Sequence, residues 1–396
     1  MVARRRRPGK TVAGKSAYAW LALALVLVLG LAVSAYFYSG PYYQFDDGKY
    51  IAFAKQMLNG TFTITQSPRA FGFLMAVIEA LSMGAFGTGV LGEILPTVLE
   101  YAALVVLTFL VGRKLADDRL GLVGALLTAT MPFVVQYTTR VVPDMMLGVL
   151  AGASMYALLA GIGKDRIDYG MMTVSGMIAG LGIFLKLGGA GIGVAVLVAL
   201  LLLERKALPA FLLGFVVVIA IYAASFYLMT GGNISYLSQY SAHQIATNPS
   251  TLGNNLITMA VVAVVPVTIG QTYPIEMLFL LIIAGTYAAF KDENRAMKLT
   301  AVIFWFVFLY LFLGTESLSA YAPMVVVDRY LIVVAVPMAL LGAYVPVGMY
   351  RTFSAAGHRI AAAAVLVLLL GLVFLFYYTA YSAVYAYSAY IRSLPP

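Results

Sequence analysis

The sequence predicts an all-α protein that crosses a membrane many times, and composition is the first reason. Of its 396 residues, 62% are hydrophobic and 10% are charged, and the mean hydropathy is +0.94. A soluble domain of this length needs a more polar surface. The second reason is that apolar runs long enough to cross a bilayer recur along the chain, beginning near residues 17–38.

Composition also narrows the chemistry. The chain has no cysteine, which excludes disulfides, cysteine-based metal sites and thiol nucleophiles. Its two histidines argue against a multi-histidine metal site. The net charge of +9 is spread over several short basic segments. In a membrane protein such segments indicate orientation rather than nucleic-acid binding.

The basic segments predict which ends of the helices face the cytoplasm. The chain starts with MVARRRRPGK, so the positive-inside rule places the N-terminus in the cytoplasm, together with the later basic segments 112–119, 163–168, 204–206, 291–298 and 350–359. Crossings between them predict spans near 90–112, 119–138, 143–162, 168–186, 189–204, 208–229, 273–290, 298–314, 325–349 and 361–385. With the first span the total is about eleven, and the C-terminus is external.

Two apolar segments are predicted to lie along the external interface instead of crossing. Residues 69–87 contain Glu79, and counting them as a span would reverse the orientation of every later basic segment. Residues 254–270 contain Asn254, Asn255 and Pro266 and receive the same assignment. The alternative is about thirteen spans.

These predictions divide the chain into four parts. Residues 1–16 form a basic cytoplasmic N-terminus, and residues 17–229 form a transmembrane module that includes the first external loop, 39–89. Residues 230–272 form a second external loop with an interfacial helix. Residues 273–396 form a C-terminal transmembrane module. We expect the plasma membrane of a prokaryote as the location.

Ionisable residues gather on the predicted external side. Two carboxylates stand side by side in QFDDGKY, and basic residues come from distant parts of the chain; the set is Asp46, Asp47, Arg69, Arg140, Lys186 and Arg329. Charges at the edge of a membrane are costly and are therefore functional candidates. Structural interpretations stay open as well: an ion pair of Arg140 with Asp144, an outward-reaching Lys186, an interface anchor at 328–330, and a helix cap at 46–47.

One chemistry suits this set. A carboxylate can deprotonate a hydroxyl group as its oxygen attacks a sugar carbon. Arginine and lysine can stabilise a phosphate leaving group, and a lipid phosphate would place the reaction at a membrane interface. On a helix that begins here, Asp46 and Tyr50 share a face and Asp47 points about 100° away. We therefore expect Asp46 to be the base and Asp47 its partner.

Two other functions remain as alternatives. A transporter or flippase of a lipid-linked or anionic solute would use the same cations but would need no base. A non-catalytic assembly subunit is the third hypothesis.

Ordered motifs in the chain resemble those of a known family. FDDGKYIAFAKQMLNGTF (45–62) is similar to an Asp-Asp/Glu-x-x-Tyr stretch at the start of a first external loop, and SPRAFGFLMAVIEAL (67–81) to the juxtamembrane helix that follows it. The Arg-x-x-x-Asp at 140–144, GLGIFLKLGGAGI (180–192) and DRYLIVVAVPMALLGAY (328–344) continue the order. Together they resemble the GT-C glycosyltransferases, in the branch of protein O-mannosyltransferases and aminoarabinose transferases.

The resemblance implies a fold and a donor. The GT-C fold carries two juxtamembrane helices in the first external loop, which favours about eleven spans. The donor would be a polyprenyl- or dolichyl-phosphate sugar, transferred with inversion to a hydroxyl of a glycan, lipid or protein. No cofactor is expected, although a divalent ion at the carboxylate pair is an alternative.

The resemblance also assigns residues. It matches Asp46, with Asp47 beside it, to the catalytic acidic position, and Arg140, Lys186 and Arg329 to the donor phosphate side. The missing proline in KLGG weakens the match at Lys186. Further substrate contacts are expected from Tyr50, Arg69, Glu79, Asp144, Tyr330 and His243.

Overall fold

The computed structural model describes residues 12–37, 46–163, 166–233, 235–236, 254–256, 276–292, 294–315 and 328–393. Helices make up this part of the chain, apart from loops and one isolated bridge between Ile162 and Ile167. The α-helices are α1 (Val12–Tyr36), α2 (Asp46–Leu58), α3 (Phe73–Phe86), α4 (Val90–Leu115), α5 (Asp118–Ala129), α6 (Pro132–Gln136), α7 (Pro143–Gly161), α8 (Tyr169–Leu181), α9 (Gly191–Leu203), α10 (Leu208–Met229), α13 (Glu276–Lys291), α14 (Arg295–Leu313), α15 (Ala335–Ala355) and α16 (Arg359–Ser393). The 3-10 segments are η1 (Ile64–Gln66), η2 (Pro68–Phe71), η3 (Gly182–Phe184), η4 (Leu187–Ala190), η5 (Arg205–Ala207) and η6 (Asp328–Val334).

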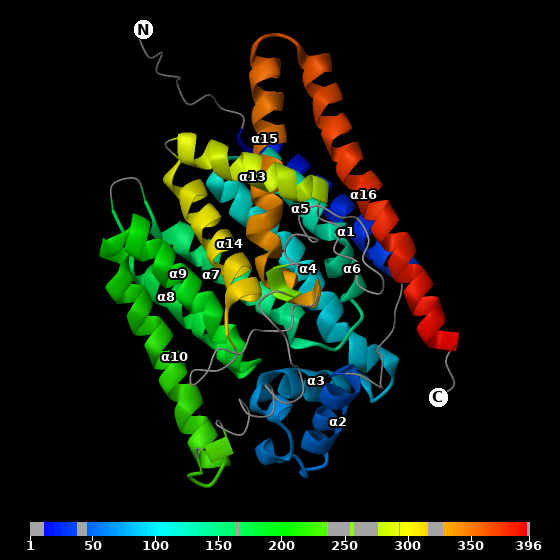
Figure 1. Ribbon diagram of the computed structural model, residues 1–396, viewed down its shortest axis with the longest axis vertical. Coiled ribbons are helices and arrows are strands. Elements are labelled where there is room, and N and C mark those ends of the chain that lie inside the picture. The colour runs from blue at the N-terminus through cyan, green and yellow to red at the C-terminus, as the bar shows by residue number, and fades with distance from the viewer. Residues whose placement is uncertain are drawn as a thin grey trace.

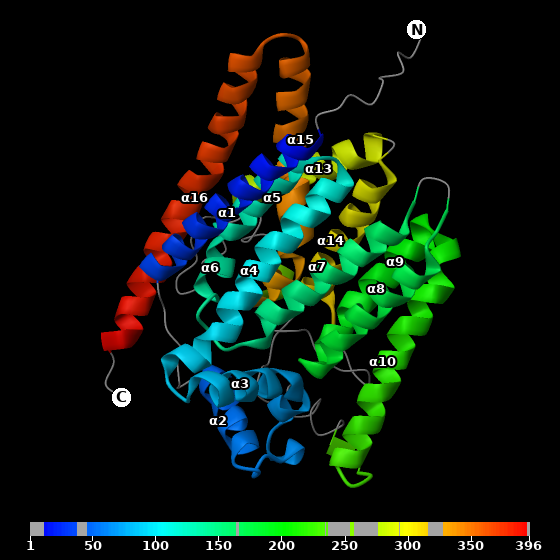
Figure 2. The same ribbon diagram turned by 180° about the vertical axis from the view of Figure 1, so that it is seen from behind.

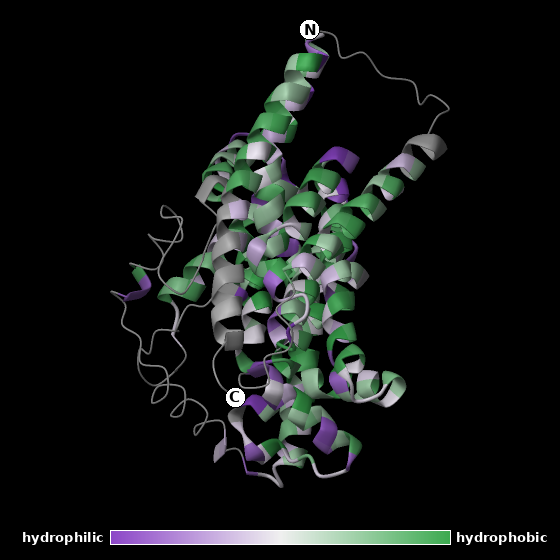
Figure 3. Ribbon diagram, turned by 90° about the vertical axis from the view of Figure 1, so that its right-hand side faces the viewer, coloured by the Kyte–Doolittle hydropathy of each residue, from purple (hydrophilic) through white to green (hydrophobic). Residues whose placement is uncertain are grey.

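The long helices form one bundle, and α2 and α3 lie across one of its ends (Figure 1, and Figure 2 from behind). Helix α7 packs against α4 and α8, α8 packs against α10, and α15 packs against α5, α13 and α16. Hydrophobic residues dominate the bundle, and hydrophilic residues are frequent around the α2–α3 end (Figure 3). The segment 69–87, predicted to lie at the interface, thus forms η2 and α3 at the end of the bundle.

Within the described residues, six helices are long and apolar enough to cross a membrane, so the chain is an integral membrane protein. They are Ala17–Tyr36, Val90–Leu115, Pro143–Gly161, Arg205–Met229, Arg295–Leu313 and Arg329–Ala355. The other predicted spans correspond to shorter apolar helices at Tyr169–Phe184, Leu187–Leu203, Leu278–Lys291 and Arg359–Leu375, and to the pair α5 and α6. The total of about eleven spans stays a prediction. The predicted interfacial helix 254–270 lies outside the described residues except at 254–256.

Two predicted spans are interrupted. The span 119–138 breaks between α5 and α6, because Pro132 has no N–H for a continuing helix. The hydroxyl of Tyr101 donates to the carbonyl of Ala129 at this break, at 2.7 Å. The span predicted for 168–186 ends as an α-helix at Leu181, and Lys186 has extended backbone, with φ −165° and ψ 151°. Lys186 therefore lies between the 3-10 segments η3 and η4. The sequence had predicted a continuous α-helix that ends at this residue.

Small residues bring α8 and α10 into close contact. A Cβ atom at Gly176 would lie 2.0 Å from the carbonyl oxygen of Phe211, and one at Gly214 would lie 2.1 Å from that of Thr173. Neither position has room for a side chain. This is the usual way in which transmembrane helices approach closely, since lipid supplies little hydrophobic drive for helix association.

The basic segments predicted to be cytoplasmic lie close to one another in three dimensions. Arg351 pairs with Asp117 at 2.7 Å, which joins the segments 350–359 and 112–119. Arg295 pairs with Glu204 at 2.6 Å, which joins 291–298 and 204–206. Which side of the membrane they face stays a prediction.

Candidate active site

Helix α2 starts with two aspartates whose side chains meet different partners. Asp46 receives the guanidinium of Arg69 on η2, with Nε 2.7 Å from Oδ1. It also receives Nη2 of Arg329 on η6, 2.8 Å from Oδ2. The side chain of Asp46 is 16% exposed. The first loop and the last third of the chain therefore meet at this carboxylate.

Asp47 is fully buried and faces the segment that precedes α7. Nη2 of Arg140 lies 2.7 Å from Oδ2 of Asp47, and Nε lies 3.2 Å from the same oxygen. The backbone N–H of Val141 donates to Oδ1 of Asp47 at 2.7 Å. A charge-assisted pair with several hydrogen bonds is the arrangement that a buried carboxylate needs. Asp47 thereby ties α2 to the start of α7.

Asp144, in the first turn of α7, links two more cations. Nζ of Lys186 lies 2.9 Å from Oδ1 of Asp144, and Nε of Arg329 lies 3.5 Å from Oδ2. The ring of Tyr330 supports the same cations: Nζ of Lys186 is 3.9 Å from the ring centre and Cζ of Arg329 is 5.7 Å from it. Both contacts have the geometry of cation–π interactions.

The eight residues Arg69, Asp46, Arg329, Asp144, Lys186, Tyr330, Asp47 and Arg140 are called the ion network below. Its members come from η2, α2, η6, α7, the segment before η4, and the segment before α7. Most of these links join residues that are far apart in sequence; Asp46 and Arg329, for example, are 283 positions apart.

The charges of the ion network influence the protonation states of Asp46 and Tyr50 on α2. Burial alone raises the pKa of Asp46, but the charges of Arg329 and Arg69 outweigh it and hold the pKa below its ordinary value. Burial, followed by the charge of Asp46, raises the pKa of Tyr50. Asp46 is therefore an ionised acceptor at neutral pH, and buried Tyr50 keeps its proton.

Most predicted site residues gather here, with corrections to two structural interpretations. Instead of the helix-end pair of Arg140 with Asp144, the contacts join Arg140 to Asp47 and Asp144 to Lys186, and Nε of Arg329 lies 3.5 Å from Asp144. Lys186 does not reach outward as a lone charge, because it contacts Asp144 and Tyr330. The side chain of Arg140 points to Asp47 and is 10% exposed, so its predicted phosphate contact stays a prediction.

Glu79 and His243 stand apart from this group. His243 lies outside the described residues. Glu79 is fully buried on α3, and neither carboxylate oxygen has a hydrogen-bond partner among the described residues. Burial, followed by the charges of Glu100, Glu93 and Asp47, raises its pKa to about 9. Glu79 is therefore neutral and buried, and its predicted substrate contact stays a prediction.

Two acidic residues near Glu79 escaped the sequence analysis. Glu100 is buried on α4, and its carboxylate likewise lacks a hydrogen-bond partner within the described part of the chain. Glu93 is buried near the start of α4 and pairs with Lys55 of α2 at 3.1 Å. The sequence feature that could have identified both residues is a glutamate inside an apolar span. Burying a carboxylate there costs free energy, so such a residue is a functional candidate.

Metal ligands do not cluster in the described part of the chain: no group of three or more His, Asp or Glu side chains there could hold an ion. At Asp46 and Asp47, guanidinium groups and a backbone N–H already occupy the carboxylate oxygens.

Known proteins share this fold. The chain resembles ArnT from Cupriavidus metallidurans in the apo state, with 17% identity, a TM-score of 0.64, and coverage of 94% of this chain and 76% of that one. It matches the same protein bound to undecaprenyl phosphate with 16% identity, a TM-score of 0.61, and coverage of 96% and 75%. Archaeal AglB from Archaeoglobus fulgidus, in complex with an inhibitory peptide and a dolichol-phosphate, matches with 14% identity, a TM-score of 0.53, and coverage of 92% and 56%.

The sequence comparison adds a family. A search of curated proteins found no significant match. Residues 68–229 match the family model described as dolichyl-phosphate-mannose-protein mannosyltransferase. This range includes η2, α3 and the segments that carry Arg140, Asp144 and Lys186. The chain therefore shares the fold of ArnT and AglB, and its residues 68–229 are similar to the dolichyl-phosphate-mannose-protein mannosyltransferase family.

Proposed function

We propose that this protein transfers a sugar from a polyprenyl- or dolichyl-phosphate donor to a hydroxyl group, with inversion and with Asp46 as the general base. The contrast between the two aspartates carries the proposal. Asp47 is fully buried in its pair with Arg140, whereas Asp46 remains 16% exposed. Of the two, Asp46 is the carboxylate that an acceptor hydroxyl can reach.

The transfer step would use the cations around Asp46. The hydroxyl oxygen attacks the anomeric carbon, the bond from that carbon to the phosphate oxygen breaks, and the lipid phosphate leaves with the bonding electrons. Asp46 takes the hydroxyl proton. Arg329 and Lys186 would stabilise the charge on the phosphate, since both lie within one chain of contacts through Asp144.

The low pKa of Asp46 fits such a step. An aspartate held ionised by Arg329 and Arg69 is a weak base. It is sufficient if the bond to the phosphate is largely broken before the proton moves, because the cations lower the energy of the leaving group. Donor phosphate would also compete with Asp46 for Arg329, which would free the carboxylate for the acceptor.

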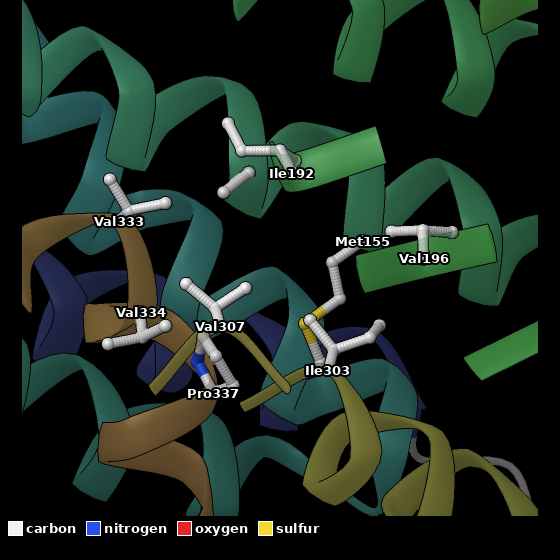
Figure 4. A pocket seen from close by; sticks show the side chains of 9 residues that line it. Met155, Ile192, Val196, Ile303, Val307, Val333, Val334 and Pro337 are labelled. Atoms are coloured by element: carbon white, nitrogen blue, oxygen red, sulfur yellow. The ribbon is translucent and has the colours of Figure 1, made fainter. Parts of the chain in front are cut away.

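A small apolar cavity lies between helices that also carry part of the ion network. Helices α7, α9 and α14, with η6 and the start of α15, line it with aliphatic side chains (Figure 4). Val333 follows Tyr330 by three positions, and Ala151 lies two turns along α7 from Asp144. The proposed donor is a lipid phosphate whose phosphate group Arg329 and Lys186 would hold. The lipid phosphates bound to ArnT and AglB are of the same chemical class.

The test is transfer by an Asp46→Asn protein. Purified protein is incubated with polyprenyl- and dolichyl-phosphate sugars, mannose first, and the products are identified by mass spectrometry. We expect Asp46→Asn to lower turnover by about 100-fold or more, the typical effect of losing a general base. Donor binding, measured with labelled lipid phosphate, should persist.

A matched control uses an aspartate at the opposite end of the bundle. Asp118→Asn breaks an exposed pair with Arg113 and should leave transfer unchanged. Unchanged transfer by Asp46→Asn would contradict Asp46 as the base. Absence of transfer by the natural protein, with lipid phosphate still bound, would instead favour a protein that only binds or moves the lipid-linked solute.

A further inference from the structure

A cluster of aromatic side chains lies beside the ion network and belongs to none of its ion pairs. We call Phe71, Phe73, Phe184, Tyr222 and Phe226 the aromatic clamp. Phe71 ends η2, Phe73 begins α3, Phe184 ends η3, and the other two lie in the C-terminal half of α10. The clamp therefore joins η2 and α3 to the segment between α8 and α9 and to α10.

Tyr222 lies at the centre of the aromatic clamp and is 3% exposed. Its ring centre is 5.1 Å from that of Phe184 in an edge-to-face contact, and 6.1 Å from that of Phe226 in a stacked one. A further stacked contact reaches Phe73 at 6.5 Å. The hydroxyl of Tyr222 donates to the backbone carbonyl of Phe71 at 3.2 Å.

The two segments that Tyr222 contacts, at Phe71 and at Phe184, also carry basic residues of the ion network. Arg69 stands two positions before Phe71 and bonds to Asp46 at 2.7 Å. Lys186 stands two positions after Phe184 and bonds to Asp144 at 2.9 Å. One side chain on α10 thus contacts the neighbours of both cations.

The two segments also touch each other through their backbones. A Cβ atom at Gly72 would lie 1.8 Å from the carbonyl oxygen of Leu185. Gly72 follows Phe71, and Leu185 precedes Lys186. A shift of either segment is therefore transmitted to the other, and the placement of Arg69 and Lys186 depends on a shared support.

We infer that Tyr222 is a positioning residue for sugar transfer, which holds the segments of Arg69 and Lys186 against Asp46 and Asp144. The inference rests on the proposed function, because it takes Asp46 as the base. The physical reason is that displacing a catalytic group by about 1 Å can cost about 100-fold in rate. Aromatic packing and one hydrogen bond to the backbone hold the geometry without adding charge to the site.

The protonation of Asp46 reports on this geometry. The charged groups that act on Asp46 are Arg69 on η2, Arg329 on η6 and Lys49 on its own helix. If Arg69 moves away, one of the cations that lower the pKa of Asp46 is lost. The pKa of Asp46 then rises, and the acid limb of kcat/KM moves to higher pH. A purely structural role for Tyr222 would reduce the amount of folded protein and leave this limb in place.

The experiment compares pH profiles of transfer for four variants of the full chain. Tyr222→Ala removes the ring, and Tyr222→Phe removes only the hydroxyl. Arg69→Gln gives the shift expected when that cation is lost. The combined variant Tyr222→Ala with Arg69→Gln tests whether the two act through the same contact. Tyr227→Ala, an exposed tyrosine on the same helix, is the matched control.

We expect Tyr222→Ala to lower kcat/KM by about tenfold or more and to move the acid limb in the same direction as Arg69→Gln. The combined variant should show no further shift, and Tyr222→Phe should show a smaller loss. If Tyr222→Ala does not fold, Tyr222→Leu and Tyr222→Phe carry the test, because they retain most of the buried volume.

Two outcomes separate this inference from the proposed function. An acid limb that moves in Arg69→Gln but stays in place in the folded Tyr222 variants overturns the positioning role alone. An acid limb that Arg69→Gln leaves in place contradicts Asp46 as the base, and the inference falls with it.

Discussion

Asp46 and Asp47 differ in surroundings although they are neighbours in the chain. Consecutive residues of a helix point about 100° apart, so one carboxylate meets Arg69 and Arg329 while the other meets Arg140. The carboxylate of Asp46 is partly exposed to solvent, whereas that of Asp47 is fully buried. Their positions on the first turn of α2 therefore separate Asp46, the proposed base, from Asp47, which anchors the helix through Arg140.

Replacing Asp47 should act mainly on stability. Asp47→Asn leaves Arg140 buried without its charged partner, and breaking such a pair costs about 3–5 kcal/mol. We expect a lower unfolding temperature in detergent, and a smaller loss of turnover per folded molecule than in Asp46→Asn. A folded Asp47→Asn protein with the slower turnover of the two would show that the roles are reversed.

The raised pKa of Glu79 predicts that the stability of the folded protein depends on pH. Its pKa is raised to about 9 in the folded protein from an ordinary value of 4.5. Below pH 4.5 the group is neutral in both states, and as pH rises towards 9 the unfolded state gains from ionisation that the folded state resists. The folded protein should therefore lose stability across this window.

Glu79→Gln should remove that loss, because glutamine stays neutral at every pH. We expect the variant to be more stable than the natural protein at pH 8, by as much as about 1.4 kcal/mol for each pH unit above 4.5. At pH 5 the difference should nearly vanish. Thermal unfolding at the two pH values is the measurement, and an equal difference at both would contradict a raised pKa at Glu79.

At the scale of elements, η6 is the segment from the last third of the chain that supplies residues to the site. It carries Arg329 and Tyr330 and continues into α15 without a break. Arg329 contacts Asp46 through Nη2 and Asp144 through Nε, so its planar group spans two carboxylates. A lysine has one nitrogen and cannot make both contacts from one position.

Arg329→Lys should therefore weaken use of the donor without unfolding the protein. We expect the KM for the lipid-phosphate sugar to rise by about tenfold, equivalent to about 1.4 kcal/mol. Circular dichroism and size-exclusion chromatography check the fold. An unchanged KM would remove Arg329 from the phosphate site.

The sequence predicted the elements better than their breaks. Hydrophobic runs located the long helices, because a bilayer accepts little else, and the carboxylate pair marked the start of α2. The break at Lys186 was missed, since its glycines are also common inside transmembrane helices. Tyr222 gave no signal either, because one tyrosine in an apolar span looks like packing until its partners are known.

The sequence also could not predict which acidic side chain of the site pairs with which basic one. The charges themselves were visible, but the choice of Asp47 and not Asp144 as the partner of Arg140 depends on how α2 packs at the end of the bundle. Tertiary contacts decide such a choice. The composition of the segment does not.

On the scale of the whole molecule, the basic segments predict one orientation. They meet at one end through pairs such as Arg351 with Asp117, whereas α2 and α3 lie at the other end (Figure 1). We expect reporter fusions to place residues 113–119 and the N-terminus in the cytoplasm and the C-terminus outside. A reporter at 113–119 that is active only outside would contradict the orientation, and with it the interfacial position of α3.

The contact between Asp46 and Arg329 also bears on biogenesis. The two residues are 283 positions apart, so the ribosome completes most of the chain before the second one exists. Arg69, Arg140 and Lys186 emerge earlier and can neutralise their carboxylates as the first module enters the membrane. Insertion of the early helices is thus separated in time from completion of the site. The contact between Asp46 and Arg329 can form only after the last third of the chain has joined the bundle.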